Sequence, residues 1–334
     1  MLARKHPLLA AFNLVFVPLL LAACGGSDDP PPTPAPPTQP ESAVQVGGAL
    51  DRPGAVTLTQ LKTQPAITQT VNFSSGTGAQ THTYVGASLW TLLNGLGIQV
   101  NAAVKNDVLG KYVLATGSDG YKTVFSLGEL NPDFGNRPSL VAYAEVLNGA
   151  TAALSTDGPL RVTAPGDGKG GRYVSGLVRL DVRASGSTVA ATDGAVSTQF
   201  TVSGAVKQSM TFDAAALLAL PAVTRTVGGN TYTGVSLWDL LNTTVGLATD
   251  PAAKNASLGM YAVATGSDGY KALISLGELD PGFGNQPDLI AYDMNGAGLG
   301  GNGFARLVIP NDGKAGRYVS NLISLEVFAA PPAQ

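Results

Sequence analysis

A long stretch of this sequence occurs twice. Residues 111–140 and 260–289 are identical at 20 of 30 aligned positions, at a constant offset of 149. A spacing near 150 residues is far longer than the period of roughly 20 to 50 residues found in solenoid repeats. The sequence therefore predicts a duplicated whole domain. Matching segments flank the pair on both sides: 84–90 with 232–238, and 161–173 with 306–318.

The first residues have the features of an export signal. A basic head at 4–6 precedes an apolar stretch at 8–23, which contains Pro18. This stretch is shorter than the roughly 20 residues that a membrane-spanning helix needs. Residues 21–24 read Leu-Ala-Ala-Cys and resemble the lipobox of bacterial lipoproteins. The resemblance implies cleavage before Cys24, diacylglycerol on its thiol and acylation, as with palmitate, of its new amino group. An ordinary secretory signal with an incidental cysteine is the alternative.

The segment after this signal is rich in proline. Seven prolines lie between residues 30 and 40, which rules out a helix and predicts an extended tether over residues 24–43. Such a tether holds the folded part away from a lipid surface, at about 3.1 Å per residue. The expected organisation is a signal peptide at 1–23, the tether at 24–43, a first module at 44–182, a linker at 183–199 and a second module at 200–328.

Composition excludes several classes of function. The net charge is −3 and no run of Lys or Arg is present, so we expect no nucleic-acid partner. Cys24 is the only cysteine, and His82 is the only histidine after the signal. Disulfides, thiolate metal sites and multi-histidine zinc sites are therefore excluded, and we predict no catalytic or metal-ligating residue. We expect His82, in a polar stretch, to be a solvated turn residue.

Short periodic segments predict an α+β fold in which strands dominate. Ser88 and Ser236 are expected to cap amphipathic helices, because leucines follow them at helical spacing. Ser-Leu-Gly-Glu segments beginning at Ser126 and Ser275 match a capping box. Strands are expected, among other places, at 44–50, 66–73, 112–116, 160–164, 200–206, 222–227, 261–265 and 306–309.

Five phrases recur in the same order in both copies. The ordered set resembles the sulfite-oxidase-type molybdopterin-binding domain family, over roughly 44–182 and 200–328. The resemblance implies a β-rich α+β domain, in two tandem degenerate copies, that can hold a pterin dithiolene carrying molybdenum. In the second copy the phrases are Tyr232-Thr-Gly-Val-Ser-Leu-Trp, Ser267-Asp-Gly-Tyr, Leu289-Ile-Ala-Tyr-Asp-Met-Asn-Gly, Arg306-Leu-Val-Ile-Pro and Gly316-Arg-Tyr-Val-Ser-Asn-Leu.

Two departures from the family concern its cofactor. The resemblance places a molybdenum-ligating cysteine just before the Tyr/Trp-x-Gly-Val phrase, but residues 73–78 and 226–230 contain none. Ser74 or Ser75 is an oxygen donor that could replace it in the first copy. The lysine of the family's Val-Lys-Trp-Leu phrase, which favours the cofactor's phosphate, is also missing from both copies.

Basic residues near the glycine-rich loops at 166–172 and 311–317 are the candidates for binding a cofactor phosphate. Glycines in these loops are able to expose backbone N–H groups to an anion. The alternative, which we favour from the sequence, is a pair of flexible Asx turns in which Asp167 and Asp312 bond to their own backbone. The candidates are Arg161, Lys169, Arg172, Arg306, Lys314 and Arg317.

We therefore expect a lipid-anchored protein on the periplasmic face of the outer membrane, since Gly25 rather than aspartate follows Cys24. Because the thiolate is missing from both copies, we expect a non-catalytic binding module without a cofactor. Its partner would be a small anionic ligand or another envelope protein. The alternative is a molybdopterin-dependent oxidoreductase that acts on a small oxyanion or sulfoxide-like substrate and uses a non-cysteine metal ligand.

Overall fold

The computed structural model describes residues 41–154 and 156–331, and the residues from 41 onward form one compact unit. The predicted signal peptide, Cys24 with its lipidation, and the proline-rich part of the tether lie outside the described residues. Within the described part of the chain, no helix has both the length and the apolar character needed to cross a membrane.

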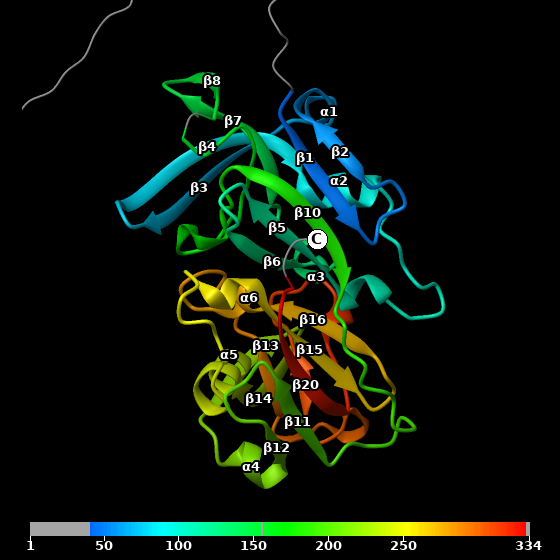
Figure 1. Cartoon of the computed structure of the whole chain (residues 1–334). Coiled ribbons are helices and arrows are strands. Elements are labelled where there is room, and N and C mark those ends of the chain that lie inside the picture. Colours follow the sequence, from blue (N-terminus) through cyan, green and yellow to red (C-terminus); the bar gives the residue numbers. More distant parts are fainter. Residues whose placement is uncertain (1–40, 155, 332–334) are drawn as a thin grey trace, which may run out of the picture. The chain divides into compact units, whose positions relative to one another are not determined.

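The first copy consists of two five-stranded sheets and short helices (Figure 1). One sheet has the order β2-β1-β10-β5-β6, and the other has the order β3-β4-β7-β8 with β9 paired to β7. The elements are β1 (Ala43–Gly48), β2 (Gly54–Thr57), α1 (Leu58–Lys62), β3 (Ile67–Ser75), β4 (Gly78–Ser88), α2 (Leu89–Gly95), η1 (Asp107–Gly110), β5 (Lys111–Gly117), β6 (Lys122–Ser126), α3 (Leu127–Leu130), β7 (Leu140–Leu147), β8 (Ala150–Ala153), β9 (Arg161–Val162), η2 (Gly170–Arg172) and β10 (Leu177–Ala184).

The second copy repeats this topology. Its sheets have the orders β12-β11-β20-β15-β16 and β13-β14-β17-β18, with β19 paired to β17. The elements are β11 (Gln199–Gly204), β12 (Met210–Asp213), α4 (Ala214–Leu218), β13 (Ala222–Val227), β14 (Asn230–Ser236), α5 (Leu237–Asp239), η3 (Leu240–Thr244), η4 (Ala256–Gly259), β15 (Met260–Gly266), β16 (Lys271–Ser275), α6 (Leu276–Leu279), β17 (Leu289–Met294), β18 (Ala297–Gly298), η5 (Gly300–Asn302), β19 (Arg306–Val308), η6 (Ala315–Arg317) and β20 (Leu322–Ala329). The strand-rich α+β prediction is confirmed.

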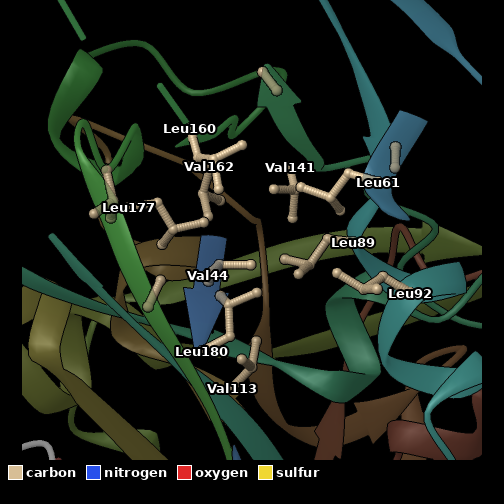
Figure 2. Close-up of a cluster of buried hydrophobic side chains, with 14 of the residues drawn as sticks. Val44, Leu61, Leu89, Leu92, Val113, Val141, Leu160, Val162, Leu177 and Leu180 are labelled. Atoms are coloured by element: carbon tan, nitrogen blue, oxygen red, sulfur yellow. The ribbon is translucent and has the colours of Figure 1, made fainter. Parts of the chain in front are cut away.

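Each copy has its own hydrophobic core between its two sheets. Figure 2 shows the first core, where side chains from strands of both sheets converge with leucines of α1 and α2. The predicted N-caps are confirmed, since Ser88 and Ser236 accept backbone hydrogen bonds from Thr91 and Asp239. The short helices thus begin where serine satisfies N–H groups that have no partner within the helix.

A third apolar cluster joins the two copies. It consists of Tyr112, Leu114 and Val124 from the first copy and Tyr261, Val263 and Leu273 from the second. The rings of Tyr112 and Tyr261 are 4.5 Å apart. Strands β5 and β15 are therefore buried along their whole length, because one face packs on its own core and the other on the opposite copy.

Candidate functional site

An open cavity of about 490 Å³ lies mostly in the first copy, between the tip of the β3–β4 hairpin and the loop at 166–175, and residues of the second copy complete its lining. Its lining combines hydroxyl groups, glycines, aromatic rings and three basic side chains. The lining residues are Phe73, Ser74, Ser75, Gly76, Asp119, Tyr121, Arg161, Lys169, Gly170, Gly171, Tyr173, Ser175, Lys254, Asn255 and Phe283.

The hairpin and the loop are joined by their backbones. The amide of Ser74 donates to the carbonyl of Gly168 at 2.9 Å, and Ser74 forms a parallel bridge with Lys169. The ring of Phe73 lies 4.3 Å from that of Tyr173. A Cβ at Gly170 would lie 2.8 Å from the Phe73 ring, so only glycine permits this close approach. The extended hairpin is therefore one wall of the cavity.

Arg161 is held in an aromatic setting at the base of this wall. Its guanidinium carbon lies 6.0 Å from the Phe73 ring, 5.4 Å from Tyr84 and 5.5 Å from Tyr173. Its Nη1 donates to the Tyr84 hydroxyl at 2.9 Å and is paired with Asp157. Burial raises the pKa of both phenols, so they stay neutral.

Lys169 and Lys254 give the cavity its excess positive charge. Both side chains are exposed, and neither has an ion-pair partner among the described residues. Asp119 is the one carboxylate in the lining, and its Oδ1 already accepts a hydrogen bond from the amide of Tyr121. Since Arg161 is neutralised by Asp157, the two lysines outweigh the single acidic side chain. The cavity is suited to an anion.

Arg172 and Arg317 occupy buried ion-pair networks. Arg172 donates to both oxygens of Asp167 at 2.8 Å and to Glu129 at 2.7 Å. Arg317 makes the same contacts with Asp312 and Glu278. The interpretation of the two loops as Asx turns is therefore wrong, because each aspartate binds an arginine five positions later. Each buried guanidinium holds its loop by bonds to two carboxylates, and a cofactor role for these arginines stays a prediction.

The same network links the two copies. The Ser126 hydroxyl donates to Glu278 at 3.2 Å, and the Ser275 hydroxyl donates to Glu129 at 2.9 Å. Both predicted capping boxes are confirmed. Their serines therefore serve twice, as helix caps within one copy and as donors to a carboxylate of the other.

The corresponding basic residues of the second copy are placed differently. Lys314 forms an ion pair with Asp133 at 2.6 Å, and the two side chains are 65% and 62% exposed. Arg306 lies over the ring of Tyr318 at 5.2 Å, and its Nε has no hydrogen-bond partner among the described residues. The structure thus brings Arg161 and Lys169 to one cavity, whereas Lys314 is engaged by Asp133 and Arg306 by the ring of Tyr318.

The hairpin of the second copy is also shorter. In the first copy, pairing of β3 with β4 continues beyond Val71 and His82 to Ser75 and Gly78. In the second copy, pairing of β13 with β14 ends at Val227 and Asn230, and only two glycines form the turn. No residue of the second copy therefore takes the places of Phe73, Ser74 and Ser75.

His82 lies in strand β4, so the prediction of a solvated turn residue is wrong. Its Nδ1 is 2.6 Å from an oxygen of Glu145, and its ring stacks on Phe73 and Tyr84 at 5.5 and 5.3 Å. The polar residues around it belong to a strand that continues through this region. His82 supports the cavity wall from behind and is not among the lining residues.

The donor set of the cavity fits an anion better than a metal. Among residues 41–154 and 156–331, no group of three or more His, Cys, Asp or Glu side chains could hold a metal ion. The hydroxyls of Ser74 and Ser75 are the donors available in the cavity near the position where the family resemblance places its cysteine. The basic groups thus suit the phosphate of a pterin cofactor, whereas the sulfur ligand of its metal has no counterpart.

No family model matches this chain, and no curated protein matches it. Among solved structures, the sulfane dehydrogenase SoxCD from Paracoccus pantotrophus is similar at a TM-score of 0.35 and 13% identity, over 84% of this chain and 77% of that one. This likeness is distant, so the assignment to the sulfite-oxidase type stays a prediction.

Proposed function

We propose that the first copy binds a small anionic ligand in its cavity and that the protein acts as a non-catalytic binding module anchored to the cell envelope by lipid. The observation that carries this proposal is the cavity itself, where Lys169 and Lys254 have no ion-pair partner among the described residues. Its volume of about 490 Å³ lies in the usual range for small-molecule sites.

The electrostatics of the cavity favour an anion over a neutral ligand. A unit charge about 4 Å from a lysine ammonium gains about 4 kcal/mol at the effective dielectric constant of a protein surface, before solvation costs are subtracted. A ligand anion would supply the partner that the protein does not give to Lys169. The serines and the glycines 170 and 171 allow close approach to hydroxyl and backbone donors.

Direct titration tests this proposal. The full chain, purified in detergent, is titrated calorimetrically with 4-methylumbelliferyl phosphate, an aromatic phosphate ester. We expect Lys169→Ala to weaken binding by about fivefold, the contribution of one partly solvated charge. Lys314→Ala is the matched control and should leave binding unchanged, because Lys314 is paired with Asp133. Equal affinities of the two variants and the unsubstituted protein would contradict the proposal.

Anchoring to the envelope is supported by the sequence of residues 21–24 and by the proline-rich tether. The test is incorporation of radiolabelled palmitate during growth, followed by separation of membranes. We expect labelled protein in the outer-membrane fraction. A Cys24→Ala variant should carry no label and leave the membrane, whereas label in that variant would contradict lipidation at Cys24.

A molybdopterin-dependent oxidoreductase is the second candidate. The observation that favours it is the presence of Ser74 and Ser75 in the same cavity as Arg161 and Lys169. These residues would hold the pterin phosphate and offer an oxygen to the metal, and the bound cofactor would supply two-electron redox chemistry. Metal analysis after expression in a host that makes the cofactor decides the matter. Near-stoichiometric molybdenum would replace the first proposal, and its absence would exclude the second.

A further inference from the structure

We infer that the second copy completes the ligand site of the first, and that the site takes a planar ring carrying a phosphate or sulfonate group. This inference rests on the proposed anion-binding function and extends it. Three lining residues, Lys254, Asn255 and Phe283, come from the second copy. The two copies therefore make one site in this cavity, and the second copy supplies both a charge and a ring.

Asn255 fixes the Lys254–Asn255 pair at the edge of the cavity. Asn255 Nδ2 donates to the hydroxyl of Tyr121 at 3.1 Å, and this hydroxyl donates to the carbonyl of Gly171 at 2.7 Å. The backbone of Asn255 is left-handed, with φ of 52°, a conformation that asparagine tolerates better than most residues. This chain of contacts holds Lys254, the preceding residue, at the rim of the cavity.

Phe283 shapes the loop that carries Lys169. The amide of Gly168 donates to the carbonyl of Phe283 at 3.0 Å. A Cβ at Gly171 would lie 2.4 Å from the Phe283 ring, so glycine is needed where the loop meets this side chain. The position of Lys169 in the first copy thus depends on a residue of the second.

Cationic and aromatic side chains both line the cavity, which indicates the ligand class. Lys169 and Lys254 reach the cavity from opposite copies. Phe73 and Tyr173 line it from the first copy, and Phe283 does so from the second. Aromatic rings stack on flat π systems, and lysine ammonium groups bind phosphate or sulfonate as point charges. A ligand with both features contacts the lysines and the aromatic rings, whereas an inorganic anion contacts only the lysines.

The duplication provides a matched control for Lys254. Asn106 Nδ2 donates to the hydroxyl of Tyr270 at 2.9 Å, and the amide of Gly313 donates to the carbonyl of Phe134 at 2.9 Å. These contacts are equivalent to those of Asn255 and Phe283, but here residues of the first copy contact the second copy. Lys105 therefore stands where Lys254 does, but it faces the copy whose hairpin is too short to form the wall.

Calorimetric titration of the full chain in detergent tests the inference with three probes. These are 4-methylumbelliferyl phosphate, the uncharged 7-methoxy-4-methylcoumarin and inorganic phosphate. We expect the aromatic phosphate to bind most tightly. Lys254→Ala should weaken its binding by about three- to fivefold, as for one solvated charge pair, while Lys105→Ala leaves it unchanged. The neutral ring should be insensitive to both substitutions.

The outcomes separate this inference from the proposed function. If Lys169→Ala weakens binding and Lys254→Ala does not, the cavity binds anions but the second copy adds no charge, and the inference fails alone. If neither substitution matters, the proposed function fails as well. Inorganic phosphate binding as tightly as the aromatic ester would overturn the ring-bearing ligand class. Equal losses of affinity from Lys254→Ala and Lys105→Ala would contradict a site that is formed only at the hairpin of the first copy.

Discussion

The two copies share a fold, but only the first has the wall that closes the cavity. Their strand orders are the same, and each has a buried arginine bonded to an aspartate five positions earlier and to a capping glutamate. They differ at the hairpin, where residues 72–81 of the first copy correspond to two glycines in the second. The strand order and the buried arginine networks are common to both copies, whereas the site depends on the longer hairpin of the first copy.

The largest effect is expected from removing the buried arginine that both copies share. Arg172→Met and Arg317→Met each leave two buried carboxylates without their cation. The loss of one partner of a buried ion pair costs about 3–5 kcal/mol of unfolding free energy. We expect both variants to be destabilised by similar amounts, measured by urea denaturation at pH 7.

A lower pH provides the control for this prediction. Burial raises the pKa of Asp167, while Arg172 opposes that shift. Without the arginine, protonation removes the stranded charge, so the stability deficit of Arg172→Met should shrink as the pH falls towards 5. A loss of stability in only one of the two variants would show that the two copies are not equivalent. A loss of stability that does not depend on pH would indicate lost packing instead of an unpaired buried charge.

Exchanging the hairpins addresses what the copies do not share. Replacing residues 72–81 by Gly-Gly, as in the second copy, removes Phe73, Ser74 and Ser75. We expect the affinity for 4-methylumbelliferyl phosphate to fall by about 100-fold, or about 2.7 kcal/mol, since a wall and its ring contacts are lost. Calorimetry measures the affinity.

The reciprocal exchange sharpens the result. Inserting the sequence of residues 72–81 in place of Gly228 and Gly229 should create a second site, and the stoichiometry should rise from one ligand to two. Thermal unfolding distinguishes loss of the site from loss of the fold. Retained affinity in the shortened variant would show that the hairpin is not the wall that the cavity needs.

The sequence predicted the shared fold better than the site. The repeat, the serine caps and the α+β class follow from local patterns such as Ser126 with Glu129. The hairpin was missed because residues 72–81 are rich in glycine and polar residues, which local rules assign to a turn. Lys254 and Asn255 were missed because only tertiary packing brings them to Tyr121. The Lys-Asn pair that recurs at 105–106 was the available signal.

A buried carboxyl distinguishes the copies in their pH dependence. Asp288 takes the place of Ser139, and each residue's carbonyl accepts from the first amide of a helix. Neither side-chain oxygen of Asp288 has a hydrogen-bond partner within the described part of the chain. Burial, reinforced by Glu278, raises the pKa of Asp288 well above 3.8, although Arg317 opposes the shift. The folded protein therefore holds this proton more tightly than the unfolded chain.

Stability should accordingly fall as the pH rises. Below about pH 4 Asp288 is protonated in both the folded and the unfolded state, so it does not lower the unfolding free energy. Above about pH 4 Asp288 ionises first in the unfolded chain, and this favours unfolding. A single group changes the unfolding free energy by at most about 1.4 kcal/mol per pH unit. Asp288→Asn removes this slope, as urea denaturation from pH 4 to 8 would show. Glu278, whose pKa burial raises to about 7, keeps a slope of the same sign between its unfolded and folded pKa values. An unchanged slope would mean that Asp288 is ionised in the fold.

The smallest expected effect concerns the acidic partner of Arg161. Asp157 pairs with Arg161 and accepts from Ser175 at 3.0 Å, whereas Asn302, in the equivalent place, accepts from Ser320 at 2.9 Å. Asp157→Asn reproduces the arrangement of the second copy and leaves the positive charge of Arg161 without its acidic partner. We expect calorimetry to show about three- to tenfold tighter binding of 4-methylumbelliferyl phosphate, together with a loss of stability, because the buried Arg161 cation loses its partner.

Its matched control is Asn302→Asp, which supplies Arg306 with an acid in the copy without the long hairpin. We expect that variant to bind as the unsubstituted protein does. Since the ligand replaces the missing carboxylate, its addition should also restore the thermal stability of Asp157→Asn more than that of the unsubstituted protein. Weaker binding in Asp157→Asn would show that Asp157 positions Arg161 for the ligand instead of competing with it. The excess charge of the cavity would then come from the two lysines alone.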